Sequence, residues 1–217
     1  MKRILVINPN STQAVTDAID EALIPLRFFG NGPTIDCETL HTGPPGIETM
    51  AHVNQVIKPL IDLMTEQENS TDAFVIACYS DPGLVQARKT IKTPVFGVAE
   101  SSMLYALTRG NLLGVISLFP NSAERHSRYV AQLGLTERVA ADLPVYLGVV
   151  ELQDRDRAYN KLKAVGRTLI HKNRADVLLL GCAGMARYRK NLEADLGVPV
   201  VDPTHAAVTM AIGTICT

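Results

Sequence analysis

The sequence has little of what marks several large classes of protein. Its 217 residues carry a formal net charge of −1, and no basic run is longer than a few residues. This argues against a nucleic acid or an anionic membrane as partner. No apolar run approaches the roughly 18 residues that a membrane span needs, and the opening MKRILVINPNST lacks the apolar stretch and cleavage pattern of a signal peptide. We therefore expect a cytoplasmic protein.

The chain also lacks clustered metal ligands. Its four cysteines follow no C-x-x-C spacing, and its five histidines are equally dispersed. Zinc sites need such ligands close together, so no metal site is expected. A free cysteine in a reducing compartment is usually a small buried hydrophobe, and packing is our interpretation of Cys37 and Cys216.

What the sequence does have is a regular alternation of short apolar runs and helix-like stretches. The segment 3–8, for example, has an apolar run over residues 4–7, is rich in β-branched side chains and is followed by a proline, which is typical of a buried parallel strand. The alternation predicts βαβ units and mostly parallel sheets covered by helices. The predicted strands are 3–8, 34–40, 73–78, 94–98, 111–117, 142–152, 176–181 and 198–202. The predicted helices are 11–26, 50–67, 82–91, 100–109, 121–135, 154–173, 185–195 and 204–216.

The two halves of the chain align with each other. The segment from Asp72 to Cys78 matches the segment from Asp176 to Cys182 at a constant offset of 104 residues. The pairs TPVFG and VPVVD, and VINPNS and VISLFPNS, follow the same order at nearly the same offset. We infer an α/β fold of two pseudo-symmetric halves, the first made of residues 1–99 and 204–217 and the second of residues 100–203, with the active site in the cleft between them.

Cys78 and Cys182 occupy matching places in these halves, because each directly follows a buried strand. Ligands of parallel sheets bind beyond the carboxyl ends of the strands, so the two thiols would approach one cleft from opposite sides. Inverting a stereocentre requires two acid/base groups on opposite faces of one carbon, and a thiol with an ordinary pKa near 8.5 can serve as either. The sequence therefore predicts a catalytic pair, with core packing as the alternative.

The segments that follow each cysteine predict how charge would be stabilised. After Cys78, SDPG (80–83) offers a side-chain N-cap and a proline at the first helical position, and a helix N-terminus lowers the pKa of a nearby thiol. After Cys182, the small residues Ala183 and Gly184 allow backbone N–H groups to approach a ligand closely. Those groups could hold the negative charge that develops on a carbonyl oxygen.

Polar side chains near the strand ends are candidate ligand contacts. The alternative for Asn8 and Ser11 is that they only end a strand and cap a helix, and the alternative for Glu100 is that it caps the next helix. The NPNST and SLFPNS loops contain no Arg or Lys, which favours a neutral polar ligand over a carboxylate. The predicted ligand contacts are Asn8, Ser11, Tyr79, Ser80, Glu100, Ser117, Ala183 and Gly184.

The ordered segments INPNST, GPPGIE, VIACYSDPG, PVFGVAESSM, LLLGCAGMA and LGVPVVD resemble the aspartate/glutamate racemase superfamily, and within it the hydantoin racemase and allantoin racemase group. The resemblance covers nearly the whole chain. It implies two Rossmann-like halves, Cys78 and Cys182 as the acid/base pair, no cofactor or metal, and a homo-oligomer.

Departures from the family pattern bear on the substrate. Amino-acid racemases of this superfamily usually follow the first cysteine with Asn-Thr, whereas this chain has Tyr79 and Ser80. The resemblance therefore favours a 5-substituted hydantoin, allantoin or a related small ureido compound. The alternatives are an aspartate/glutamate-type racemase, a maleate isomerase-like enzyme and a non-catalytic small-molecule binding protein.

Overall fold

The strands form two separate four-stranded sheets in the computed structural model, which describes residues 2–28 and 32–216. The first sheet has the order β2-β1-β3-β4 and the second the order β6-β5-β7-β8, with all neighbours parallel. Since the order is the same in both, β3 of the first sheet corresponds to β7 of the second, which confirms the two pseudo-symmetric halves. The strands are β1 (Arg3–Asn8), β2 (Thr34–Thr39), β3 (Ala73–Ile76), β4 (Val95–Gly97), β5 (Leu113–Ser117), β6 (Val139–Pro144), β7 (Val177–Leu180) and β8 (Val200–Val201).

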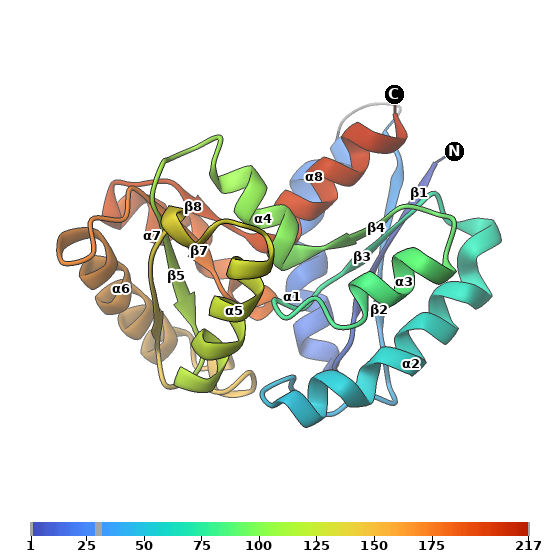
Figure 1. Ribbon diagram of the computed structural model, residues 1–217, viewed down its shortest axis with the longest axis horizontal. Helices are drawn as coiled ribbons and strands as arrows, with labels where there is room; N and C mark the ends of the chain where they lie inside the picture. The colour runs from blue at the N-terminus through green and yellow to red at the C-terminus, as the bar shows by residue number, and fades with distance from the viewer. Residues whose placement is uncertain (1, 29–31, 217) are drawn as a thin grey trace.

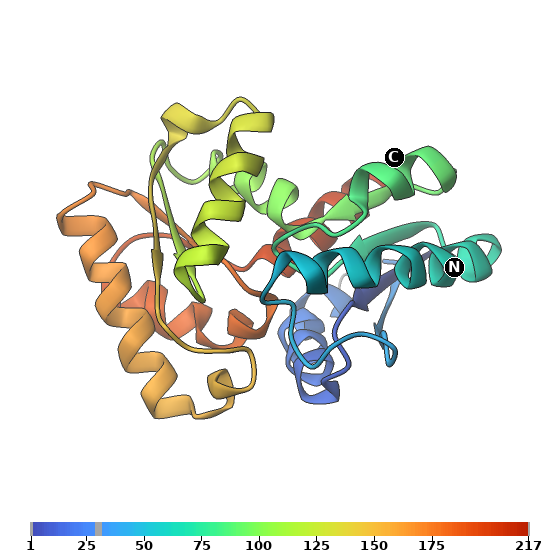
Figure 2. The same ribbon diagram turned by 60° about the horizontal axis from the view of Figure 1, so that its bottom comes forward.

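Helices cover both faces of each sheet, and the two halves lie side by side (Figures 1 and 2). The α-helices are α1 (Gln13–Leu23), α2 (Met50–Gln67), α3 (Leu84–Thr90), α4 (Val98–Ala106), α5 (Pro120–Gln132), α6 (Arg155–His171), α7 (Arg189–Leu196) and α8 (Pro203–Ile215). Short 3-10 turns are η1 (Ile24–Phe28), η2 (Glu68–Ser70), η3 (Thr136–Arg138), η4 (Glu151–Gln153) and η5 (Ala183–Tyr188).

The central strands are buried on both faces because their apolar side chains alternate between two helix layers. In β1, Ile4 and Val6 belong to the apolar cluster that includes α1 and α8. Leu5 and Ile7, which point the other way, pack with the apolar faces of α2 and α3. This double burial explains why β1 is continuously apolar in sequence, and it leaves only the strand ends for polar groups.

The last helix returns to the first half of the molecule. Helix α8 follows β8 of the second sheet, but it packs against β1, β3 and β4 and lies beside α4 (Figure 1, red). The division of the chain at residues 99 and 203 stays a prediction, and residues 1, 29–31 and 217 of the proposed halves lie outside the described residues.

The strand predicted over 142–152 is wrong in its second part. Strand β6 runs from Val139 to Pro144 and ends there. Tyr146 adopts a positive φ of 56°, which no strand allows, and Glu151 already begins a 3-10 turn. The alternating apolar side chains of this stretch are buried against the rest of the molecule, and the sequence pattern did not distinguish such a packed loop from a strand.

Candidate active site

Cys78 and Cys182 lie at matching places in the two sheets. Cys78 comes two residues after the end of β3, and Cys182 two residues after the end of β7. Both are half-buried and line one cavity. The electrostatic effect of Cys182 on Cys78 is large enough to raise the pKa of the Cys78 thiol. The fold therefore brings together two thiols that are 104 residues apart in sequence.

The cavity is small and half-open to solvent. Its free space is about 30 Å³, which is room for a few water molecules. A ligand larger than a few water molecules therefore enters only when the lining side chains or the two halves move apart. The lining residues are Asn10, Val15, Ile47, Ala77, Cys78, Tyr79, Ser80, Leu118, Ser122, Arg125, His126, Val149, Gly181, Cys182, Ala183 and Gly184.

Burial dominates the acidity of both thiols. It raises the pKa of the Cys78 thiol to about 12 and that of the Cys182 thiol to about 11. Hydrogen bonds from the backbone N–H groups of Ser80 and Gly184 act in the opposite direction, because they favour the thiolates of Cys78 and Cys182 respectively. At neutral pH both thiols of the ligand-free site are therefore protonated.

A helix follows Cys78 as predicted, but its predicted side-chain cap is wrong, and so is the expected lowering of the Cys78 pKa. Helix α3 begins only at Leu84, and its N-cap is Gly83, at φ 72°, with no side-chain cap. Asp81 instead turns toward α4, where its carboxylate accepts hydrogen bonds from the N–H groups of Ala99 and Glu100, both at 2.9 Å. The Asp81 carboxylate thus caps α4 and connects the loop after Cys78 to the start of that helix.

Glycine is required at the start of α4 to make this contact. A Cβ atom on Gly97 would overlap the carboxylate of Asp81. The hydroxyl of Tyr129 in α5 also donates to Asp81, at 3.0 Å. Asp81 therefore connects the Cys78 loop with α4 and α5.

Arg125 is the principal residue that the sequence interpretation missed. It lies in α5, lines the cavity and lowers the pKa of the Cys78 thiol by its positive charge. Its Nη1 donates to the carbonyl oxygens of Glu48 and Asn121, at 3.1 and 3.2 Å, and its Nη2 to Oγ of Ser122 at 3.2 Å. The prediction of a neutral ligand considered only the loops NPNST and SLFPNS, and the Arg125 cation reaches the cavity from outside both of them.

His126 and Tyr79 form one wall of the cavity. The two rings meet edge to face, with centroids 4.8 Å apart. Nδ1 of His126 lies 2.6 Å from Oδ2 of Asp142, and both side chains are buried. An ionised carboxylate only accepts, so Nδ1 carries the proton and the orientation of the imidazole is held by Asp142.

Four of the predicted ligand contacts line the cavity and four do not. Tyr79, Ser80, Ala183 and Gly184 belong to its wall. The others are engaged elsewhere in the fold, as follows.

Asn8 is buried below the site, and its Nδ2 donates to Asn10 and Thr16. It therefore positions Asn10, which does line the cavity. Ser11 contacts the following loop through its N–H, which donates to the carbonyl of Pro44 at 2.9 Å.

Ser117 and Glu100 also lie outside the cavity wall. Ser117 is fully buried at the end of β5. Glu100 forms a two-pronged ion pair with Arg88, at 2.9 and 3.1 Å. Neither arrangement leaves the side chain facing the thiols.

The spacing of residues in one predicted helix could have identified part of the cavity wall that the sequence interpretation missed. Ser122, Arg125 and His126 stand at positions i, i+3 and i+4 of the predicted helix, and therefore share one face. Ile47 of the GPPGIE loop and Val149 of the loop after β6 complete the lining. Their approach depends on Glu48, whose Oε1 accepts from the N–H of Val149 in the other half at 3.1 Å.

Two absences hold within residues 2–28 and 32–216. No group of three or more His, Cys, Asp or Glu side chains there is placed to hold a metal ion. No helix in that part of the chain is long and apolar enough to cross a membrane.

Comparison with known proteins defines the class. The fold matches that of allantoin racemase from Klebsiella pneumoniae with a TM-score of 0.93 and 28% identity, over 100% of this chain and 88% of that one. Allantoin racemase from Pseudomonas fluorescens matches with a TM-score of 0.93 and 26% identity, over 99% and 91%. Hydantoin racemase from Paenarthrobacter aurescens is 34% identical over 96% of this chain and 89% of its own. The protein is an enzyme, an isomerase of the racemase type.

The family follows from a second comparison. The model of the Asp/Glu/Hydantoin racemase family matches residues 4–211. The chain therefore belongs to this family, as its ordered segments indicated.

Proposed function

We propose that the protein is a cofactor-independent racemase in which Cys78 and Cys182 exchange protons at C5 of a 5-substituted hydantoin, allantoin or a related small ureido compound. One observation carries the proposal: two thiols at equivalent strand ends of two pseudo-symmetric sheets line the same cavity. The names of the related hydantoin and allantoin racemases support the ring as the substrate class.

The reaction needs one thiolate and one thiol. The thiolate takes the C5 proton, so the C–H bond breaks, an S–H bond forms, and the electron pair passes into the adjacent carbonyl group as an enolate. The opposite thiol then gives its proton to the other face of C5 and becomes the thiolate. Substrate of the opposite hand reacts by the same steps in reverse, and no electrons are gained or lost.

Groups around the sulfurs favour the charged states. The N–H groups of Ser80 and Gly184 stabilise thiolates at Cys78 and Cys182, and the charge of Arg125 acts in the same sense on Cys78. Because burial keeps both thiols protonated at rest, loss of one thiol proton precedes the first turnover.

The experiment follows one enantiomer of 5-isobutylhydantoin in deuterated water by optical rotation and by deuterium at C5. We expect loss of rotation together with deuterium incorporation. Cys78→Ser and Cys182→Ser should each lower racemisation by at least about 1,000-fold, since a hydroxyl is a far weaker acid than a thiol. Cys216→Ser is the matched control, because Cys216 is exposed and outside the cavity.

Full racemase activity in either cavity variant would contradict the two-thiol mechanism. Allantoin, L-aspartate and L-glutamate, assayed in parallel, separate the ring substrates from the amino-acid alternative. Size-exclusion chromatography with light scattering tests the proposed homo-oligomer.

A further inference from the structure

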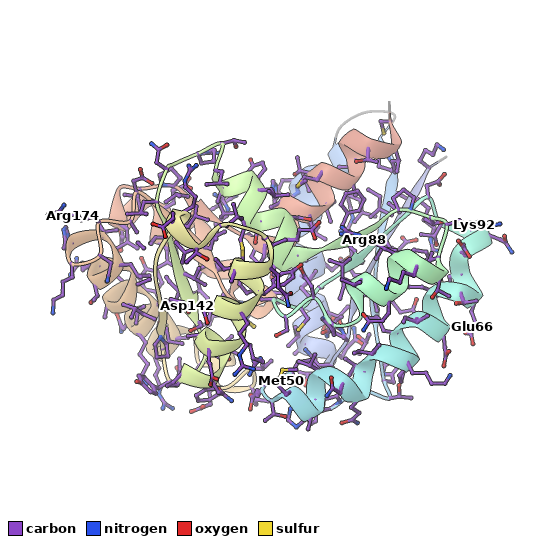
Figure 3. The ribbon with its side chains drawn as sticks, in the orientation of Figure 1. Met50, Glu66, Arg88, Lys92, Asp142 and Arg174 are labelled. Atoms are coloured by element: carbon purple, nitrogen blue, oxygen red, sulfur yellow. The ribbon has the colours of Figure 1, made fainter. Side chains whose placement is uncertain are left out.

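A second cavity lies directly beside the one that holds the thiols. It has a volume of about 220 Å³ and lies between the N-terminal end of α2 and the helix α5. Met50, at the N-terminal end of α2 (Figure 3), belongs to its wall. Four residues line both cavities, so only their side chains separate the two spaces: Tyr79, Ser80, Arg125 and His126.

The remaining wall of this outer chamber combines apolar surface with donors. Met50 and Val53 come from α2, while Arg128, Tyr129 and Gln132 come from α5. No carboxylate belongs to the chamber wall among the described residues. The composition suits a short alkyl chain that ends in a hydrogen-bond acceptor.

Arg125 stands at the junction of the two cavities, and none of its partners among the described residues is acidic. The neighbouring Arg128 pairs with Glu124, and Arg88 pairs with Glu100. For Arg125 no ion pair with a carboxylate is formed in the described part of the chain, and the guanidinium is bound only by carbonyl and hydroxyl oxygens.

The Nε atom of Arg125 is buried without a hydrogen-bond partner. A buried cation that lacks a counter-ion, and a buried donor that lacks an acceptor, are both costly. Because Arg125 lines the two cavities, an acceptor on the ligand would supply the charge partner that the guanidinium lacks.

We propose that the outer chamber holds the substituent of the stereocentre and that Arg125 binds a carboxylate or urea carbonyl at the end of that substituent. The inference rests on the proposed function, because that function places C5 between the two sulfurs. From there the shared wall of Tyr79, Ser80, Arg125 and His126 leads to a neighbouring space large enough for a substituent. The preferred substrates are therefore hydantoins with an acceptor-bearing side chain.

Binding measured by isothermal titration calorimetry tests this without requiring turnover. The probes share the hydantoin ring: hydantoin-5-acetic acid carries a carboxylate, allantoin a urea carbonyl, and 5-isobutylhydantoin neither. Arg125→Gln should weaken binding of hydantoin-5-acetic acid by about 10- to 100-fold and of allantoin by about 5- to 10-fold, since charge-assisted hydrogen bonds are lost. Binding of 5-isobutylhydantoin should weaken less than about threefold.

The controls separate charge, geometry and folding. Arg167→Gln makes the same charge change at an exposed position of α6 and should leave the three affinities as they are in the wild type. Arg125→Lys should restore part of the lost affinity, because it keeps the charge but loses the planar fork. Met50→Trp, at a half-exposed position, narrows the chamber and should weaken the three probes more than it weakens 5-methylhydantoin.

Equal weakening of all three probes by Arg125→Gln would overturn the proposal, since Arg125 would then serve the ring or the fold. Unchanged affinities, or no binding of any probe by the wild type, would overturn it as well. Racemisation is measured separately. Binding that depends on Arg125 without racemisation would contradict the proposed function alone, and racemisation without that dependence would contradict the inference alone.

Discussion

Replacing Asp81 with alanine should destabilise the whole fold, because this carboxylate connects three elements. It accepts hydrogen bonds from Ala99 and Glu100 at the start of α4, and from the hydroxyl of Tyr129 in α5. Asp81 is only 6% exposed, so water would not replace it fully at the orphaned donors. The loop that contains Asp81 also carries Cys78, which joins stability to the site.

The magnitude follows from the three contacts. Loss of the two backbone contacts is equivalent to loss of an N-cap and costs about 1–2 kcal/mol. The stranded hydroxyl of Tyr129 adds about 1 kcal/mol. The total of about 2–3 kcal/mol is a large fraction of the about 5–15 kcal/mol that stabilises a typical domain. It corresponds to a fall in Tm of about 4–12 °C for a chain of this length.

Urea denaturation followed by circular dichroism measures the free energy of unfolding of the variant. Asp81→Asn should fall between alanine and the wild type, because its amide oxygen can accept one N–H but its NH₂ group faces the other donor. The control is Asp62→Ala, which removes an exposed ion pair with Lys58 and should cost less than about 0.5 kcal/mol. If Asp81→Ala unfolds within about 0.5 kcal/mol of the wild type, the reasoning about the three buried donors is refuted.

Two further predictions concern the thiols and a buried hydroxyl. The pKa values of Cys78 and Cys182 are raised to about 12 and about 11. The fraction of enzyme molecules that carry one thiolate therefore grows as the pH rises toward these values. The racemisation kcat/KM should therefore increase about tenfold per pH unit between about pH 6.5 and 8.5, and a plateau in this range would show a thiol of lower pKa. Ser117 is fully buried and its Oγ has no hydrogen-bond partner, so Ser117→Ala should leave the free energy of unfolding unchanged or raise it by up to about 1 kcal/mol. Its KM should stay within about twofold, and a tenfold increase would make Ser117 a ligand contact after all.

The sequence predicted the order of strands and helices because each central strand is apolar on both faces. Strand β3 and strand β7 were located to within two residues on this basis. The strand prediction failed at residues 145–150 for a physical reason. A loop whose alternate side chains are buried in the fold has the same apolar pattern as a strand. The pattern of apolar residues reports burial, and only the backbone angle at Tyr146 distinguishes the two structures.

The sequence did not predict which way the polar side chains point. Asn8 and Asn10 lie two residues apart in the same polar segment, yet Asn8 is used in the fold and Asn10 faces the cavity. The SDPG segment predicted that Ser80 or Asp81 caps the helix that follows it, but Asp81 caps α4 instead because Gly97 leaves room for its carboxylate. In each case several hydrogen-bond partners are within reach, and the local sequence does not determine which of them is used.

What the sequence determined by itself is the duplicated α/β plan and the equivalence of Cys78 and Cys182, because strand burial and internal repetition are written in the order of residues. Only the tertiary structure decided what surrounds those thiols. The carbonyl of Glu48 from the first half meets Arg125 of the second, 77 residues away. Burial then raises the pKa of both sulfurs, whereas the local sequence predicted a lowered pKa for Cys78. Such effects depend on distances through space, and these arise only when the two halves pack together.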